Sequence, residues 1–510
     1  MRIPSALYRS ILGALVHCAV AGTPATAQVG AQTAPDFAAF DKYVAKAAHD
    51  WNAVGLGIAV VKGDSLVFVR GYGQLELGKA ARVDEHTRFA IGSTTKAMTS
   101  AALAMLADEG KLHWDDKVID FIPELRLSDA YATRELTIRD LLTHRTGLPS
   151  TDLFWAIDEN MLPFPEMIRR LRYVRPSSSF RSTWAYQNVV YAIGGTIVER
   201  ASGMSWDAFI RSRIFAPLGM NESEALVSQI VGKVNVAVPH AQIRDTVRVV
   251  PIKTTDAVAP AGSVWSSVSD MSKWMRFMLD SGRVGPKRLI SPANFRELVA
   301  PQMRVPMEQY PALELASPHF LSYALGWFVQ DYHGKTVWMH TGSIDGMSAI
   351  IGLIPEDRVG VYVLGNLDHI ELRHALMYQV FDLYGAGARR DWSAELKALL
   401  ASKRPARPAG PAPAHVAMAK PSLPLDKYVG TFVDSAYGTI VIGVASGALT
   451  ARYDKLDFGG LDHWDYDVFR SRPKTALANP VPLAFQPDGN GGVSSVRVLG
   501  TTFVRSRVMP

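Results

Sequence analysis

A serine and a lysine stand three residues apart in Ser93-Thr94-Thr95-Lys96, where a helical pattern that runs to Glu109 begins. Residues three apart on a helix share a face. A serine hydroxyl becomes a nucleophile when a base takes its proton, and a desolvated lysine can act as that base. The helix N-terminus also places backbone N–H groups beside Ser93, where an oxyanion would form. An ordinary helix N-cap followed by an exposed Lys96 explains the same residues, so this motif alone is weak evidence.

A second motif, Tyr186-Gln187-Asn188, is the only Tyr-x-Asn in the chain. A phenolate near a lysine could carry a proton to a leaving group. The amide of Asn188 could hydrogen-bond a carbonyl or an amide of a substrate. The alternative is a loop tyrosine that packs on the helix expected from Val189 to Ala201.

A third motif, His340-Thr341-Gly342, is also unique and stands at the end of a strand-like run, before the turn-like residues 343–346. An extended segment that lines a cleft can pair its backbone with an acyl substrate. The N–H of Ser343 could then be the second donor to an oxyanion. The alternative is a surface strand end, where a histidine is commonplace.

Other candidate motifs carry less weight. Ser471-Arg472-Pro473-Lys474 repeats the Ser-x-x-Lys spacing, but Pro473 breaks a helix interior, so we expect a chance match. His369 and His374 are five residues apart, do not share a helix face and lack the zinc-protease spacing, which favours a solvated helix start. No Gly-x-Ser-x-Gly, phosphate-loop or dinucleotide motif is present. We therefore expect no metal and no cofactor.

The elements that must position these motifs begin and end with strands. Gly57–Val61 and Ser65–Val69 flank a Gly-Asp turn and predict a hairpin. Helical segments broken by Pro and Gly fill about 137–300. Three strand-like runs then precede a helical pattern at about 372–383: residues 335–340, 347–354 and 359–364. The economical arrangement is one antiparallel sheet built from both ends, with helices around it and a helical insertion.

The chain divides into a large domain, a linker and a small domain. Residues 401–422 are rich in Pro and Ala and predict a semi-rigid linker. The residues after it read as short strands with turn signals, which predicts a small all-β barrel. The fold class expected is therefore α+β with an all-β C-terminal barrel. The boundaries we expect are 1–27 for an export signal, 28–36 for a leader, 37–400 for the α+β domain, 401–422 for the linker and 423–510 for the barrel.

The N-terminus predicts export. Arg2 and Arg9 precede a short apolar run from Ile11 to Val20, and Ala25-Thr26-Ala27 forms a small-x-small cleavage site. The run is too short to span a bilayer, and the only cysteine of the chain, Cys18, lies within it. We therefore expect a periplasmic or secreted protein without a transmembrane helix after cleavage.

Length and composition limit the function classes. The chain has 510 residues, of which 48% are hydrophobic and 20% are charged, and this excludes disorder, collagen and a coiled coil. The formal charge of +6 is spread thinly, and basic clusters are short, so we expect no nucleic-acid partner. The sequence does not indicate an oligomeric state.

Taken in order, the three motifs resemble those of the penicillin-recognising serine hydrolases, which include class C β-lactamases, D,D-peptidases, D-aminopeptidases and related esterases. The flanking segments 136–148, 214–220 and 260–271 are also similar, and the resemblance covers about residues 37–390. Tyr428-Val429-Gly430-Thr431-Phe432 and the strands after it resemble lipocalin-like domains appended to some of these peptidases. The resemblance implies a β-lactamase/transpeptidase-like fold.

The resemblance also implies roles for the motif residues. Ser93 would be the acylated nucleophile, and Lys96 and Tyr186 the coupled base and acid. The backbone N–H groups of Ser93 and Ser343 would form the oxyanion hole. The residues expected to bind substrate are Asn188, His340, Thr341 and Gly342.

One departure separates the possible activities. Many β-lactamases of this type have a lysine where this chain has His340, and histidine is mostly neutral near pH 7. This favours an exported peptidase or amidase that acts on small-molecule or peptide substrates, D-residue peptides among them. An esterase or β-lactamase with the same machinery is the first alternative. A non-enzymatic binding protein on the same scaffold is the second.

Overall fold

The computed structural model describes residues 35–157, 160–243, 246–385, 387, 390–403, 419–472 and 480–506. The predicted export signal and most of the leader and linker lie outside this part, as does Lys474 of the second Ser-x-x-Lys motif. None of the helices in the described part combines the length and hydrophobicity that a membrane span requires.

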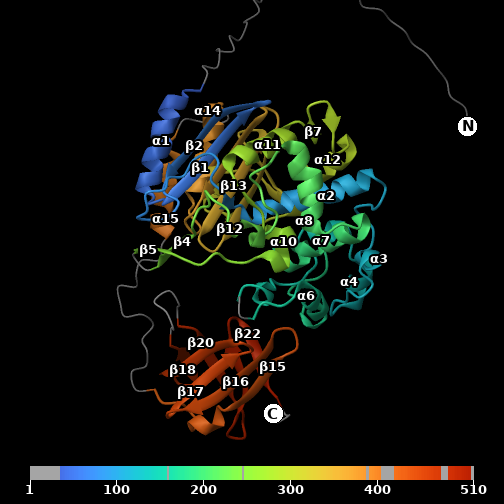
Figure 1. Cartoon of the computed structure of the whole chain (residues 1–510). Coiled ribbons are helices and arrows are strands. Elements are labelled where there is room, and N and C mark those ends of the chain that lie inside the picture. Colours follow the sequence, from blue (N-terminus) through green and yellow to red (C-terminus); the bar gives the residue numbers. More distant parts are fainter. Residues whose placement is uncertain are drawn as a thin grey trace, which may run out of the picture. The chain divides into compact units, whose positions relative to one another are not determined.

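An eight-stranded antiparallel sheet lies at the centre of the large domain, in the order β2-β1-β14-β13-β12-β11-β10-β9 (Figure 1). β1 pairs with β14, so the two ends of the domain meet in one sheet, as predicted. The turn at Gly63-Asp64 joins β1 to β2, which confirms the predicted hairpin. The strands are β1 (Gly55–Lys62), β2 (Ser65–Gly73), β9 (Met303–Arg304), β10 (Leu321–Tyr323), β11 (Phe328–Tyr332), β12 (Lys335–Ile344), β13 (Met347–Ile354) and β14 (Val359–Gly365).

The strands β1, β13 and β14 are buried on both faces of the sheet, which explains their near-continuous apolar sequences, whereas the edge strand β2 is mostly exposed or half-buried. Because successive side chains point to opposite faces, Ile58 and Val60 pack in one core and Ala59 and Val61 in another. The first core is completed by α1 (Phe37–Asp50), α14 (Leu372–Leu383) and α15 (Trp392–Lys403). The second core is completed by α2 (Lys96–Asp108), α7 (Asn188–Ser202) and α11 (Val268–Leu279), as Figure 1 shows.

The chain between α2 and β9 is mainly helical, as predicted, and also contains short two-stranded sheets. Side-chain caps begin several of these helices: Thr137 and Asp140 form a capping box on α5, and Ser267 caps α11. The further helices are α3 (Val118–Phe121), α4 (Ala130–Glu135), α5 (Ile138–Leu142), α6 (Phe164–Arg170), α8 (Trp206–Ile210), α9 (Ala216–Leu218), α10 (Ala259–Gly262), α12 (Pro292–Val299) and α13 (Ala312–Ala316). The short strands are β3 (Phe89–Ala90), β4 (His240–Ile243), β5 (Thr246–Val249), β6 (Trp265–Ser266), β7 (Arg283–Val284) and β8 (Lys287–Arg288).

The C-terminal residues form a closed antiparallel barrel, as predicted. Pairing between β15 and β22 closes it, and alternate residues such as Ile440 and Ile442 fill the interior. The strands are β15 (Gly430–Asp434), β16 (Gly438–Ala445), β17 (Ala448–Tyr453), β18 (Leu456–Asp465), β19 (Val468–Ser471), β20 (Pro482–Pro487), β21 (Val493–Val498) and β22 (Thr501–Arg505). Ser471 therefore ends a strand, which is consistent with a chance Ser-x-x-Lys match there.

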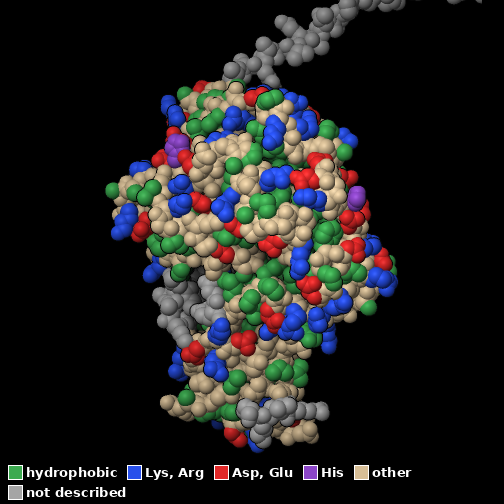
Figure 2. All heavy atoms as spheres, turned by 45° about the vertical axis from the view of Figure 1, so that its right-hand side comes forward, with side chains coloured by type: hydrophobic (Ala, Val, Ile, Leu, Met, Phe, Trp, Pro, Cys, Tyr) green, Lys and Arg blue, Asp and Glu red, His purple; other side chains and the backbone are tan. Residues whose placement is uncertain are grey.

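Side chains of both signs share the face of the molecule drawn in Figure 2. Lys and Arg alternate there with Asp and Glu, and apolar groups lie between them. Ion pairs such as Arg169–Glu166 and Arg213–Glu109 join partly exposed side chains of the large domain. On this face the Lys and Arg side chains are interspersed with acidic ones, and the expected absence of a nucleic-acid partner stays a prediction.

Candidate active site

Ser93 and Lys96 lie on a 3-10 turn that continues into α2. The turn spans Gly92–Thr95, and Lys96 is the first residue of the helix. The predicted helix from Ser93 is therefore a tighter turn over its first residues. Thr94 fixes this turn, because its hydroxyl donates to the Ile91 carbonyl at 2.9 Å and meets the Tyr362 hydroxyl at 2.6 Å. Ser93 stays partly exposed while Lys96 is completely buried.

Three oxygen atoms surround the amine of Lys96. Its Nζ lies 3.1 Å from Ser93 Oγ, 2.8 Å from Asn188 Oδ1 and 2.8 Å from the Ala261 carbonyl oxygen. Burial lowers the pKa of Lys96 well below its usual value, and the negative charge of Asp152 opposes this only in part. A neutral amine has two N–H donors and one lone pair. The two carbonyl-type oxygens take the donors, so the lone pair is left facing the Ser93 hydroxyl.

Tyr186 and Asn188 reach the site from the N-terminal end of α7. Asn188 is the first residue of that helix, and the ring centre of Tyr186 lies 4.7 Å from Lys96 Nζ. Burial raises the pKa of Tyr186 well above its ordinary value, and an interaction with the Ser93 side chain offsets part of the rise. Both pKa shifts favour the uncharged forms of this pair, the amine of Lys96 and the phenol of Tyr186.

A histidine that the motif analysis did not single out holds this loop in place. The His144 carbonyl accepts from the Ala185 N–H at 2.9 Å, and its Nδ1 accepts from the Gln187 N–H at 3.2 Å. Its ring packs against the Tyr186 ring at 4.3 Å between centres. Its only sequence signal was the similarity of segment 136–148 to the family, which named no role for it.

His340 lies beside the site but is enclosed, with 1% of its surface exposed. The Tyr323 hydroxyl is 2.9 Å from its Nε2, and its Nδ1 is 2.6 Å from the Thr341 carbonyl oxygen. Since the carbonyl can only accept, Nδ1 carries the proton and Tyr323 donates to Nε2. Burial, the largest cause, lowers the pKa of His340 to about 3. The histidine is therefore neutral near pH 7, and its contact with a substrate stays a prediction.

The buried His340 predicts a loss of stability in acid. Between pH 6.5 and 3 the unfolded chain binds a proton at this histidine and the folded chain does not, so the free energy of unfolding falls as the pH falls. From pH 7.5 to 5 this costs about 2 kcal/mol for one such group. Urea unfolding at both pH values should therefore show His340→Gln losing about 2 kcal/mol less than the wild type. An equal loss in both proteins would contradict the prediction.

His340, Thr341 and Gly342 are interior residues of β12, which runs on to Ile344 rather than ending at the motif. The strand continues because Gly342 and Ser343 still pair with Ala349 and Ser348 of β13. A Cβ atom on residue 342 would overlap with the carbonyl oxygen of Ile91. Glycine at this position therefore lets β12 lie against the turn that carries Ser93.

Arg373 hydrogen-bonds the Gly342 carbonyl and the Ser343 side chain, and the sequence analysis predicted no role for this arginine. Its Nη1 donates to the Gly342 carbonyl at 2.7 Å and to Ser343 Oγ at 2.8 Å, and its side chain is 5% exposed. The Gly342 carbonyl and the Ser343 N–H belong to one peptide group. A cation on the carbonyl therefore polarises the N–H that the sequence nominates as an oxyanion donor.

The expectation of a solvated helix start holds for His369, which is exposed, and was wrong for His374. His374 is completely buried, with Nδ1 2.7 Å from Glu371, and Glu371 also accepts from Arg373 at 3.0 Å. These side chains are buried because α14 packs against the sheet. Among the described residues, no three His, Cys, Asp or Glu side chains are grouped so that they could hold a metal ion.

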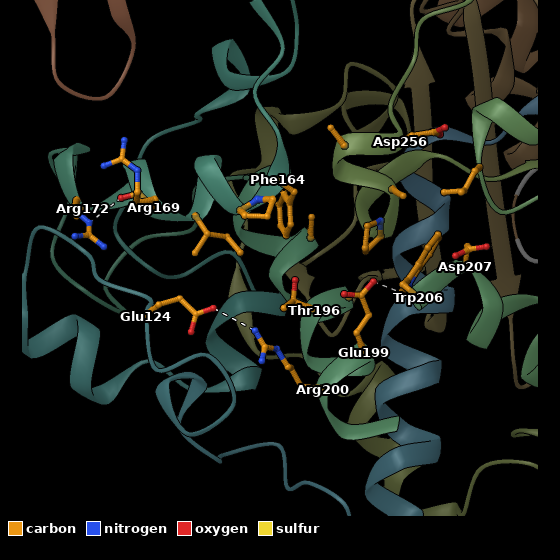
Figure 3. A pocket seen from close by; sticks show the side chains of 18 residues that line it. Glu124, Phe164, Arg169, Arg172, Thr196, Glu199, Arg200, Trp206, Asp207 and Asp256 are labelled. Atoms are coloured by element: carbon orange, nitrogen blue, oxygen red, sulfur yellow. Dashed lines mark hydrogen bonds and ion pairs between the residues drawn. The ribbon is translucent and has the colours of Figure 1, made fainter. Parts of the chain in front are cut away.

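A separate cavity of about 740 Å³ lies along α7 and contains none of the predicted site residues. Figure 3 shows Glu124 paired with Arg200 across one end and Glu199 directed at the backbone of Trp206. Hydrogen bonds connect one wall of this cavity to the chain next to the site. Trp206 Nε1 donates to Thr99 Oγ1, and Thr99 donates to the carbonyl of Pro260, the residue before the Ala261 that Lys96 contacts.

Comparisons with known proteins extend over both domains. The curated relative "Unguisins hydrolase ungD'" of Aspergillus campestris is 28% identical over 432 residues, which are 79% of this chain and 77% of that protein. A structure of an octameric penicillin-binding protein homologue from Pyrococcus abyssi superposes with a TM-score of 0.59 and 20% identity, covering 92% of this chain and all of that one. A penicillin-binding protein from Bacillus halodurans gives a TM-score of 0.53 and 19% identity, over 67% and 98% of the two chains.

Two families match the sequence itself. Residues 414–505 match a domain of unknown function (DUF3471), which spans the barrel. Residues 40–384, well over half of the chain, match the family described as Beta-lactamase. The chain therefore belongs to the beta-lactamase family.

Proposed function

We propose that this protein is a serine hydrolase that works through an acyl-enzyme on Ser93 and cleaves amide bonds of small peptides, D-residue peptides among them. The observation that carries the proposal is the buried Lys96 amine, 3.1 Å from Ser93 Oγ, whose pKa burial lowers well below its usual value. A neutral amine at hydrogen-bond distance from a serine hydroxyl is what a general base for that serine requires.

The chemistry has two steps. Ser93 Oγ bonds to the substrate carbonyl carbon while its proton moves to Lys96 Nζ, and the N–H groups of Ser93 and Ser343 hold the resulting oxyanion. The C–N bond then breaks, and the leaving amine takes a proton from the phenol of Tyr186, which Lys96 reprotonates. Water attacks the acyl-enzyme carbonyl in the second step and gives up a proton to the same pair. The bond between the carbonyl carbon and Ser93 Oγ then breaks, the pair returns the proton to Ser93 Oγ, and the acid is released.

The lack of a positive charge at residue 340 favours an amide substrate over a β-lactam. A penicillin carries a carboxylate, and many β-lactamases of this type meet it with a lysine. Here the corresponding His340 is neutral, because burial lowers its pKa to about 3. We also propose export, which is supported by the basic, apolar and small-residue pattern of residues 1–27.

A panel of three acyl donors tests this function. We expect D-alanyl-p-nitroanilide to be hydrolysed and benzylpenicillin to survive, each followed by absorbance with the intact mass of the protein recorded in parallel. Hydrolysis of p-nitrophenyl acetate alone would overturn the proposal in favour of an esterase, and consumption of penicillin in favour of a β-lactamase. No turnover of any of the three would favour a binding protein.

Gly342→Ala is expected to lower kcat/KM about 10²- to 10³-fold, because the added Cβ pushes β12 and its Ser343 N–H away from Ser93. Gly489→Ala is the matched control, since a Cβ there meets nothing within 4 Å. Melting temperatures of both variants report whether the fold is kept. Wild-type kcat/KM in a folded Gly342→Ala protein would contradict the assigned role of this strand.

A further inference from the structure

A carboxylate stands next to the catalytic side chains and has no part in the mechanism above. Asp152 begins a short 3-10 turn, Asp152–Phe154, and is only partly buried. Its Oδ1 accepts from Trp155 Nε1 at 3.0 Å, which fixes the orientation of the carboxylate. The amide nitrogen of Asn188 lies 3.3 Å from Oδ1 and 3.5 Å from Oδ2. One carboxylate oxygen is therefore held only weakly.

Asn188 connects this carboxylate to the catalytic base. Its Oδ1 accepts from Lys96 at 2.8 Å, and its Nδ2 turns the other way, toward Asp152. The two contacts fix which side of the amide faces which partner. The carboxylate thus stands one side chain away from the Ser93–Lys96 pair, close enough for its charge to act on Lys96.

Burial also acts on the basic groups around the site. It lowers the pKa of Lys96, His144 and His340, which favours their uncharged forms. The guanidinium of Arg373 is paired with Glu371 and bonded to β12. Asp152 therefore has no ion-pair partner among these four side chains, and its carboxylate attracts cations and repels carboxylates.

We propose that Asp152 is a specificity-determining residue that binds an ammonium group in the acyl half of the substrate. The substrate class is then peptides and amides with a free amino terminus near the bond that is cleaved, rather than N-acylated ones. A carboxylate that is already oriented by Trp155 and Asn188 can bind an ammonium ion with a short, charge-assisted hydrogen bond. The proposal rests on the proposed function for the reaction, but the binding preference itself can be measured without turnover.

The test is calorimetric binding to the full-length Ser93→Ala protein, in which acylation cannot occur. The ligands are D-alanyl-D-alanine amide and its N-acetyl derivative, which differ in the charge of the amino terminus. We expect the free amine to bind at least about tenfold more tightly, and Ser93→Ala/Asp152→Asn to lose that difference. Ser93→Ala/Asp120→Asn removes an exposed carboxylate from α3 instead and should keep it.

Each other result would overturn the inference. Equal affinity for the two ligands, tighter binding of the N-acetyl form, no binding of either, or a preference that survives Asp152→Asn would each remove Asp152 from substrate selection. Thermal melting shows that the variants are folded. Failure of the proposed function has a different signature, namely no amide hydrolysis by a wild-type enzyme whose Ser93→Ala form still prefers the free amine.

Discussion

Replacing Ser93 by alanine is expected to lower kcat/KM for an amide substrate by about 10⁴-fold or more, because no covalent acyl-enzyme can form. The side chain points its oxygen at the neutral Lys96 amine and is the partly exposed member of the pair. We expect the loss in kcat rather than in KM, since the substitution leaves unchanged the residues that are expected to bind substrate, Asn188 and those of β12.

Intact mass spectrometry measures this loss directly. A quenched reaction of the wild type with an ester substrate should contain protein heavier by one acyl group, and the Ser93→Ala reaction should not. Ser100→Ala is the matched control, because Ser100 is a buried serine on the same helix whose hydroxyl donates to the Ala97 carbonyl. Acylation that persists in Ser93→Ala would assign the nucleophile to another residue.

Much of the fold follows from local signals. The strands β1, β13 and β14 and the helix α14 have apolar patterns with clear ends, and the structure has them within about two residues of the predicted bounds. The strand β2 begins at Ser65 as predicted but runs on to Gly73 rather than ending at Val69. The short strands β3 to β8 were not predicted. They contain two to four residues each, and such segments form because of the partners they meet rather than because of their own patterns.

The site could be predicted where its residues are close together in the sequence or belong to an ordered set of motifs. Ser93 and Lys96 come together because three residues make about one turn, and the order of the motifs brought Tyr186 and His340 into the prediction. Asp152 and Arg373 carry no such signal. Their partners are Asn188, 36 residues away, and Gly342, 31 residues away, so only the folded sheet and helices bring them together.

Lys96→Met is the second substitution with a large expected effect, a loss of about 10²- to 10⁴-fold in kcat/KM. Methionine fills the buried space without an amine, so Ser93 keeps its proton and Asn188 and the Ala261 carbonyl lose their donor. Lys96→Arg should be equally inactive, since a guanidinium stays charged and cannot accept a proton. Lys111→Met, at an exposed position beyond the same helix, is the control.

The pH profile separates a base from a lysine that only packs. Because burial lowers the pKa of Lys96 well below its usual value, the amine loses its proton at a much lower pH than an exposed lysine does, and activity is lost when acid protonates it. The wild-type acylation rate should therefore be flat through neutral pH and fall at lower pH, and the small residual rate of Lys96→Met should lack that fall. This result would identify the Lys96 amine as the group whose protonation stops acylation. A wild-type rate that rose steadily toward pH 10.5, the range of an ordinary lysine, would contradict it.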